Sequence, residues 1–97
     1  MQKIAPKLPR TYVLEQNFPN PFNPRTKIRF ALPRSGRVQL DVFNLLGQHI
    51  VSVADAPYPA GYHTVSFDGQ NLASGVYIYR LKYDNNLEMH RKMVLIK

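Results

Sequence analysis

The chain has 97 residues, with eight prolines and neither cysteine nor tryptophan. A chain of this length forms one domain around a single core, and the missing cysteine excludes a thiol nucleophile, a disulfide and a Cys-ligated metal site. The formal net charge is +7, but the 13 Lys and Arg residues are scattered along alternating positions. That scatter is typical of the solvent face of a sheet and argues against a nucleic-acid partner.

Residues 1–11 contain three basic residues and two prolines without periodicity, which predicts a linker ahead of a domain at 12–97. No stretch approaches the ~18 or more consecutive apolar residues of a membrane span. The N-terminus also lacks the apolar core of a signal peptide. We therefore expect either a cytoplasmic protein or a piece of a longer chain whose export signal lies elsewhere.

Residues 17–24 read Asn-Phe-Pro-Asn-Pro-Phe-Asn-Pro. Proline lacks an amide donor and forces its predecessor into extended geometry, and Asn side chains bond their own backbone two residues on. We expect a stiff, irregular loop that Phe18 and Phe22 pin to the core. A role as a rigid lid on the domain is at least as well supported as a binding role, since nothing in the loop is chemically reactive.

Two-residue alternation of apolar side chains, with turn signals about every ten residues, predicts seven short strands and no helix. The expected strands are 12–16, 26–32, 37–43, 48–54, 62–68, 72–81 and 87–97. In 26–32 and 37–43, the residues expected to face the core are Ile28, Phe30, Leu32, Val38, Leu40 and Val42, and those expected on the opposite, solvent face are Lys27, Arg29, Ala31, Arg37, Gln39 and Asp41. Gly47 suits the positive-φ position of a hairpin turn, and the three-residue spacing of Ile50 and Val53 indicates a bulge. A connection is expected at 55–60. The pattern predicts an all-β, antiparallel sandwich.

The sixth strand opens with the spacing of a tyrosine corner, formed by Leu72, Gly75 and Tyr77. In such a corner the chain crosses between the sheets and the tyrosine hydroxyl bonds to backbone a few residues upstream. Gly75 would supply the backbone freedom of the tight turn. Tyr77, Tyr79 and Leu81 would share the core face.

No group of residues predicts catalysis. The histidines at 49, 63 and 90 belong to different strands and lack a metal-ligand spacing. The serines form no Gly-x-Ser-x-Gly elbow, the glycines form no phosphate loop, and no carboxylate pair suggests an acid and a base. We expect no enzymatic activity, no metal and no cofactor.

The last strand ends in four consecutive apolar residues at 93–96, bracketed by Lys92 and Lys97. An edge strand invites pairing, and flanking lysines are one way to prevent it. Two interpretations stay open. In the structural interpretation, both faces of the strand are buried, or the strand pairs on one side and stays open on the other. In the functional interpretation, the strand is accessible and another protein binds it by strand addition.

Six motifs follow one another: LEQNFPNPFNP at 14–24, TKIRF with LP at 26–33, VFN with GQ at 42–48, AGYH at 60–63, LASGVY at 72–77 and KMVLIK at 92–97. In this order and spacing they resemble the C-terminal sorting domain of proteins exported by the type IX (Por) secretion system, in its type A form. The likeness runs from about Tyr12 to Lys97. The motif positions with an implied structural role are Pro19, Asn20, Pro21, Phe22, Asn23, Pro24, Gly47, Gly61, Leu72, Gly75 and Tyr77.

The resemblance implies a seven-stranded, Ig-like sandwich at the tail of a larger cargo protein. Outer-membrane type IX components would recognise it and pass the cargo from the periplasm to the cell surface or the medium. A sortase-like peptidase would often cleave in the linker before Tyr12, and anionic lipopolysaccharide would often anchor the cargo. The residues of the implied recognition signal are Lys92, Met93, Val94, Leu95, Ile96 and Lys97.

An Ig-like accessory or carbohydrate-binding module of a secreted hydrolase or adhesin is the alternative, because the sandwich fold hosts many roles. Such a module would line up exposed aromatic side chains on one sheet. The candidates for that stripe are Tyr12, Tyr58, Tyr62 and Tyr83.

Overall fold

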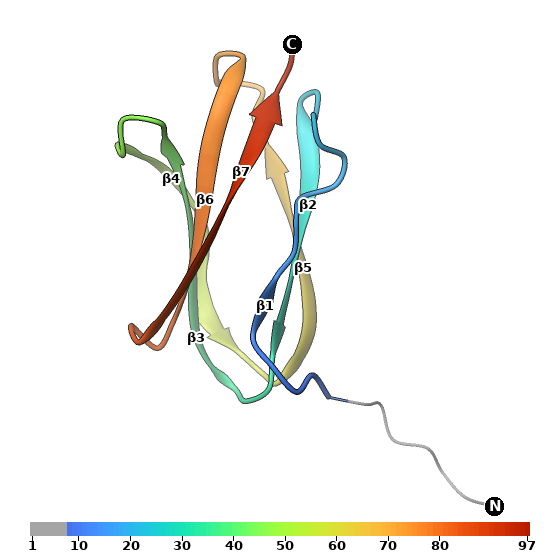
Figure 1. Ribbon diagram of the computed structural model, residues 1–97, viewed down its shortest axis with the longest axis vertical. Coiled ribbons are helices and arrows are strands. Elements are labelled where there is room, and N and C mark those ends of the chain that lie inside the picture. Colours follow the sequence, from blue (N-terminus) through green and yellow to red (C-terminus); the bar gives the residue numbers. More distant parts are fainter. Residues whose placement is uncertain (1–7) are drawn as a thin grey trace, which may run out of the picture.

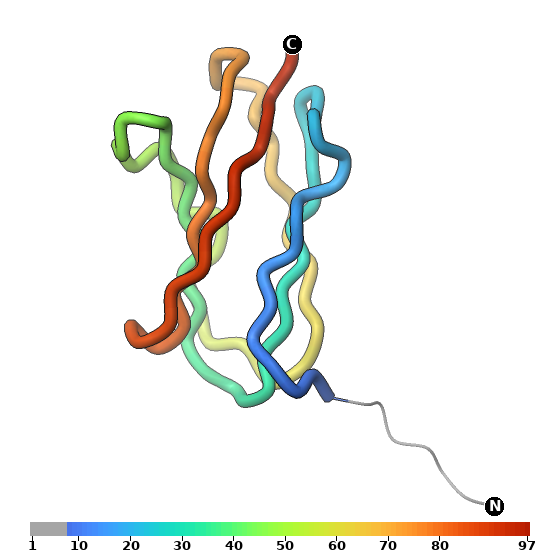
Figure 2. Tube along the Cα trace, in the orientation of Figure 1, coloured from blue at the N-terminus to red at the C-terminus, as the bar shows by residue number. Residues whose placement is uncertain are grey.

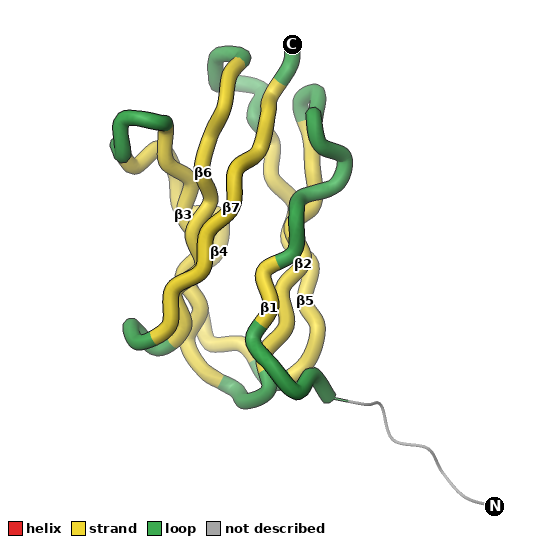
Figure 3. The backbone as a smooth tube through the Cα atoms, viewed as in Figure 1, coloured by secondary structure: helices red, strands yellow, loops and turns green. Residues whose placement is uncertain are grey.

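Seven strands and no helix make up residues 8–97, the part of the chain that the computed structural model describes (Figures 1 and 3). The strands are β1 (Val13–Leu14), β2 (Arg25–Leu32), β3 (Gly36–Asn44), β4 (His49–Tyr58), β5 (Gly61–Asp68), β6 (Gly75–Tyr83) and β7 (Leu87–Leu95). One sheet has the order β1-β2-β5 and the other the order β4-β3-β6-β7, with antiparallel pairing throughout. The prediction of a seven-stranded, Ig-like sandwich is confirmed. Among residues 8–97 there is no helix long and apolar enough to cross a membrane.

Alternating side chains of both sheets meet in one core, as a two-residue period requires. The almost fully buried residues with the predicted inward direction are Ile28, Phe30, Leu32, Val38, Leu40, Val42, Tyr77, Tyr79 and Leu81. Ala31, expected to face solvent, is 1% exposed. Its methyl group lies between the larger cross-strand neighbours Val13 and Tyr62.

The fourth strand is longer than predicted, because residues 55–58 continue β4 instead of forming a connection. Pro57 prompted that expectation, since proline cannot donate to a ladder. β4 is the edge of its sheet, however, and Pro57 pairs only with Arg37 on β3, so the missing amide is tolerated. The predicted bulge is confirmed: the β3–β4 register shifts twice, leaving Ile50 and Val53 without partners.

The tyrosine corner is confirmed where the chain crosses from β5 to β6. Tyr77 donates a hydrogen bond from its hydroxyl to the Ala73 carbonyl at 2.7 Å, four residues upstream. Gly75 has φ +156°, a backbone conformation that side chains with a Cβ rarely adopt. The corner therefore fixes where β6 begins, and with it the pairing of β6 with β7.

The two ends of the described chain lie at opposite ends of the sandwich (Figures 1 and 2). The segment after residue 8 enters beside the β2–β3 and β4–β5 connections, whereas β7 runs the length of its sheet and finishes at the other end. Residues 1–7 of the predicted linker are outside the described residues, and 8–11 form no strand. Whatever precedes the domain is therefore attached far from its C-terminus.

Candidate recognition site at the C-terminal strand

β7 is an edge strand whose inner side is paired with β6 from Tyr83↔Leu87 to Gly75↔Leu95. The pairing divides the implied recognition signal into two sets of side chains. Met93 and Leu95 point into the core and are 0% and 1% exposed. The remaining residues are half-buried or exposed, namely Lys92, Val94, Ile96 and Lys97. Only this second set can meet a partner while the domain stays folded.

The outer edge of β7 is closed at residues 92–96 by residues 16–24, which we call the Asn-Pro segment. Phe22 donates its backbone N–H to the Val94 carbonyl at 2.9 Å and accepts from the Ile96 N–H at 3.0 Å. Asn20 Oδ1 accepts from the Val94 N–H at 2.9 Å, and Gln16 Nε2 donates to the Lys92 carbonyl at 2.6 Å. The backbone groups that an added strand would need at 94–96 are therefore already occupied.

The Asn-Pro segment is held from within by Phe22, which is 1% exposed and packs edge-on against Phe67 with ring centroids 6.0 Å apart. Buried Asn17 adds polar ties, because its Nδ2 donates to the Pro19 carbonyl and to Thr26 Oγ1, both at 3.1 Å. A buried amide with its hydrogen bonds made fixes one conformation of the loop. The loop is irregular as predicted, and these contacts support its expected stiffness.

Phe18 does not pin the loop to the core as expected, since its side chain is 80% exposed. Its backbone forms an antiparallel bridge with Lys27 of β2, through hydrogen bonds of 3.0 Å in both directions. Directly opposed residues point to the same face, and Lys27 faces solvent. The bridge therefore turns Phe18 outward, leaving Phe22 as the aromatic anchor.

Tyr79 joins the start of the Asn-Pro segment to the four-stranded sheet. Its buried hydroxyl donates to the Glu15 carbonyl at 2.6 Å and accepts from the Asn17 N–H at 2.8 Å. Burial raises the pKa of Tyr79 to about 12, although the hydrogen bond from Asn17 and the charge of Arg91 act in the opposite direction. The neutral phenol is thus the form that the fold favours.

We expect Tyr79→Phe to lower the free energy of unfolding by about 1–3 kcal/mol, because the buried Asn17 N–H loses its partner. In the wild-type domain the raised pKa of Tyr79 adds about 2–3 kcal/mol to the free energy of unfolding. This contribution is fully present below pH 10 and is lost as the pH rises through about 12. The variant should lack this loss. Urea unfolding at neutral pH and at about pH 11 measures both effects, and equal alkaline slopes for the two proteins would contradict the assignment.

The corner and its neighbours hold the end of the chain through residues that the sequence did not single out. Lys97 donates its backbone N–H to Ser74 Oγ at 3.0 Å and its Nζ to the Gln70 carbonyl. Gly69 is buried, and a Cβ there would lie 3.1 Å from Leu95 and 3.3 Å from Phe22. The one sequence signal for this close approach was a glycine directly after a strand, and such a glycine is equally typical of an ordinary turn.

The other motif residues are structural in different ways. Gly47 has φ +84° in the turn before β4, so the hairpin position predicted for it is confirmed, and Gly61, the first residue of β5, has φ +136°. Leu72 is partly buried and packs against the core at the corner. The remaining prolines and asparagines of the motif, Pro19, Asn20, Pro21, Asn23 and Pro24, are exposed or half-buried on the Asn-Pro segment.

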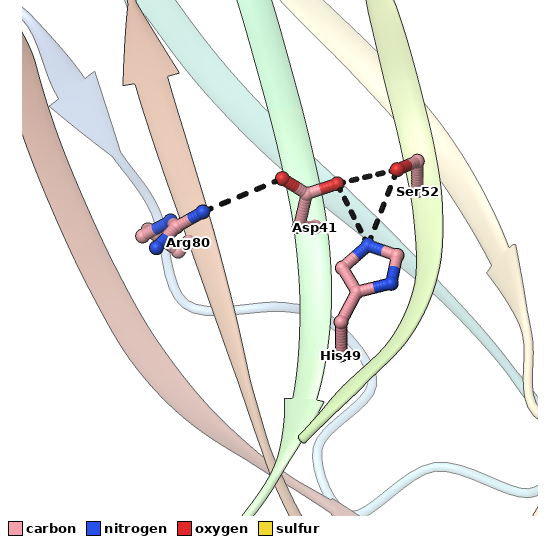
Figure 4. A network of polar contacts seen from close by, with 4 residues as sticks. All are labelled: Asp41, His49, Ser52 and Arg80. Carbon is pink, nitrogen blue, oxygen red and sulfur yellow. Dashed lines mark hydrogen bonds and ion pairs between the residues drawn. The ribbon is translucent and has the colours of Figure 1, made fainter. Parts of the chain in front are cut away.

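A cluster of Asp41, His49, Ser52 and Arg80 lies on the outer face of the four-stranded sheet (Figure 4). Ser52 Oγ donates to Asp41 Oδ1 at 2.6 Å, and His49 Nε2 lies 3.2 Å from the same oxygen and 3.3 Å from Ser52 Oγ. A catalytic triad needs the carboxylate and the serine on different ring nitrogens. Here one nitrogen meets both, and the serine proton is committed to the carboxylate.

The same cluster explains why Asp41, expected to face solvent, is only 8% exposed. Arg80 Nη2 lies 3.6 Å from Asp41 Oδ2, and its guanidinium carbon is 4.7 Å from the centroid of the Phe43 ring. The sequence placed these side chains on separate strands, and only the β4 bulges bring His49 and Ser52 to one carboxylate. The cluster therefore ties three strands together without forming a reaction centre.

The basic residues of the recognition signal belong to the cations of the domain that have no carboxylate partner in the described part of the chain. Four arginines form ion pairs with carboxylates, at positions 25, 29, 37 and 80. Within residues 8–97, Lys92 and Lys97 form none. The Lys92 ammonium is available to a partner, whereas that of Lys97 also bonds the Gln70 carbonyl and can still attract an acidic surface through its charge.

The four candidate tyrosines do not form the stripe that a carbohydrate-binding module would need. Of the four candidate tyrosines, only Tyr62 is exposed, at 53%, and the Arg29 guanidinium lies over its ring at 4.6 Å. Tyr12 and Tyr83 pack on each other with centroids 4.7 Å apart, and Tyr58 packs on Phe30.

A protein-family model described as "Secretion system C-terminal sorting domain" matches residues 16–97. The match begins at the Asn-Pro segment and includes the whole of β7. No curated protein and no solved structure matches the chain.

Proposed function

The chain belongs to the family of secretion system C-terminal sorting domains, and from this premise we propose that the outward side chains at the end of β7 are what the type IX machinery recognises. As a member of that family, the domain is a C-terminal sorting signal that sends an N-terminal cargo to the cell surface or the extracellular space. The family is not a catalytic one, and we propose that the domain itself carries out no reaction and needs no metal or cofactor.

The observation that carries this proposal is the position of β7 relative to the incoming chain. The linker side and the C-terminus lie at opposite ends of the sandwich (Figure 1). A folded cargo joined before residue 8 would therefore leave the end of β7 uncovered. The outward residues there, Lys92, Val94, Ile96 and Lys97, need no unfolding of the domain to be read.

We propose residues 1–11 as the linker to the cargo and 12–97 as the sorting domain. In this scheme the cargo passes through the periplasm, outer-membrane components bind β7, and a sortase-like peptidase cleaves in the linker. Joining of the released cargo to anionic lipopolysaccharide would complete the route. The distance between the linker side and the C-terminal end of β7 supports the order, because cleavage at one end need not disturb binding at the other.

The experiment uses a fluorescent protein with an export signal, fused ahead of the 97 residues, in a bacterium with a working type IX system. We expect the variant Lys92→Ser, Val94→Ser, Ile96→Ser and Lys97→Ser to be exported about tenfold less than the parent fusion. Loss of one contact worth about 1.4 kcal/mol gives that factor. Because Met93 and Leu95 are retained, the core is unchanged.

The control carries four serine substitutions on the outer face of the other sheet, at the exposed positions Lys27, Arg29, Tyr62 and Thr64. Export of this control at the parental level, with the β7 variant retained in the periplasm, supports the proposal. Normal export of a correctly folded β7 variant would show that the signal lies elsewhere in the domain.

A further inference from the structure

The closed edge of β7 at residues 94–96 excludes recognition by strand addition there. Recognition by strand addition needs free backbone groups at a sheet edge, and at 94–96 these groups are bonded to Asn20 and Phe22. Opening the edge would also withdraw Phe22, a fully buried core residue. A partner that binds the folded domain at residues 94–96 must therefore recognise side chains and not pair with this edge.

The outward side chains of β7 continue onto the neighbouring strands as one apolar surface. Val94 lies directly opposite Val76 on β6, and Ile78, two residues along β6, lies opposite Phe43 on β3. With Ile96, which is 50% exposed, these side chains cover the end of the sheet where the chain finishes. We call this surface the outer patch: Phe43, Val76, Ile78, Val94 and Ile96.

Charge at the outer patch is positive. Lys92 lies opposite Ile78, Lys97 follows Ile96, and neither lysine forms an ion pair within residues 8–97. The one carboxylate on the outward face of β7 is Glu88, four residues before Lys92 and about 13 Å away along the strand. On β3, Asp41 also faces outward, two residues before Phe43, but it is only 8% exposed and is paired with Arg80 at 3.6 Å. The surface thus has an apolar centre and a basic margin.

Building on the proposed function, we propose that the outer patch is the docking surface for a protein of the secretion machinery that presents an apolar area edged by carboxylates. Three of its residues, Phe43, Val76 and Ile78, are far in sequence from the C-terminal motif. Apolar contacts at the centre would supply affinity, and the carboxylates would pair with Lys92 and Lys97 and fix the orientation.

An anionic lipid surface fits the outer patch less well than a protein. Binding in the membrane interface requires apolar side chains that reach into the head-group boundary. Phe43, Val76, Ile78 and Val94 are half-buried on a sheet face, and only Ile96 of the patch is exposed. A face of half-buried side chains that do not project far is complementary to the surface of another folded protein.

The test substitutes Ile78 in the fluorescent fusion. We expect Ile78→Glu to reduce export about tenfold or more, because a carboxylate would face the partner's carboxylates as well as lose apolar contact. Ile78→Lys should reduce export less than Ile78→Glu, since the new charge has the favoured sign. The control is Thr64→Glu, an exposed, outward position on β5, which should be exported like the parent.

Thermal unfolding of each purified fusion checks the fold, and the double variant Val76→Thr with Ile78→Thr, which keeps β-branched side chains, repeats the test if Ile78→Glu is unstable. Retention of the β7 serine variant together with normal export of the Ile78 variants would overturn the outer patch but leave the proposed function standing. Equal defects for Ile78→Glu and Thr64→Glu would also overturn it. Vesicles of anionic phospholipid test the lipid alternative. If Ile78→Glu no longer binds these vesicles but is still exported normally, the patch binds lipid and the docking proposal is overturned.

Discussion

Deletion of residues 92–97 is expected to unfold the domain as well as abolish export. The deletion removes Met93 and Leu95, which are 0% and 1% exposed, and truncation of one such side chain typically costs about 2–5 kcal/mol. The two losses together approach the whole stability of a domain of this size, about 5–15 kcal/mol. The deletion also leaves the Asn-Pro segment without the strand that it borders.

Circular dichroism and resistance to protease measure this effect on the fusion before any secretion assay. We expect the truncated domain to lose its cooperative thermal transition, while the serine variant at positions 92, 94, 96 and 97 keeps it. A truncated domain that melts like the parent would show that Met93 and Leu95 contribute little to the core. Failure of the truncated fusion to reach the surface therefore identifies a signal only when the serine variant fails as well.

The strands were predictable because their evidence lies in local alternation. Ile28 and Phe30 alternate with Lys27 and Arg29, and the tyrosine corner around Tyr77 has a fixed local spacing, so both were located without tertiary information. Pro57 misled the prediction because its effect depends on whether the strand is central or at an edge. That distinction is set by the order of strands in the sheet.

The candidate site was only partly predictable for the same reason. The motif at 92–97 identified the strand, but the sequence left open whether its edge was free. Closure of that edge depends on Asn20 and Phe22, more than 70 residues earlier, and on a bridge that no local pattern encodes. The opposite directions of Phe18 and Phe22 were likewise unpredictable, because the Lys27 bridge sets the direction of Phe18.

The two motifs at the ends of the domain therefore act as one structural unit. The Asn-Pro segment supplies the neighbour that the edge of β7 lacks, and β7 in turn holds the segment through Val94 and Ile96. A stable edge keeps the terminal strand from pairing with other chains. It also holds the outward side chains of β7 in one orientation, which is what recognition of a folded face requires.

Phe22→Ala is expected to lower the free energy of unfolding by about 3–5 kcal/mol, the range for a large aromatic residue removed from a core. Phe22 is 1% exposed, contacts Phe67 and lies beside Leu95 through its backbone bridge. Loss of its ring should loosen the Asn-Pro segment, so the amides of Val94 and Ile96 should exchange with solvent faster than other β7 amides. Urea denaturation and amide hydrogen exchange of the purified domain measure the two effects.

Phe18→Ala is the matched control, because it makes the same substitution four residues away in the same segment on a ring that is 80% exposed. Its free energy of unfolding should change by no more than about 0.5 kcal/mol, as is usual for surface substitutions, and the exchange of Val94 and Ile96 should stay slow. Equal destabilisation by the two variants would mean that the segment contributes through its backbone alone. A large effect confined to Phe22→Ala, with faster exchange at β7, would show that one buried ring in the Asn-Pro segment stabilises the strand that carries the sorting signal.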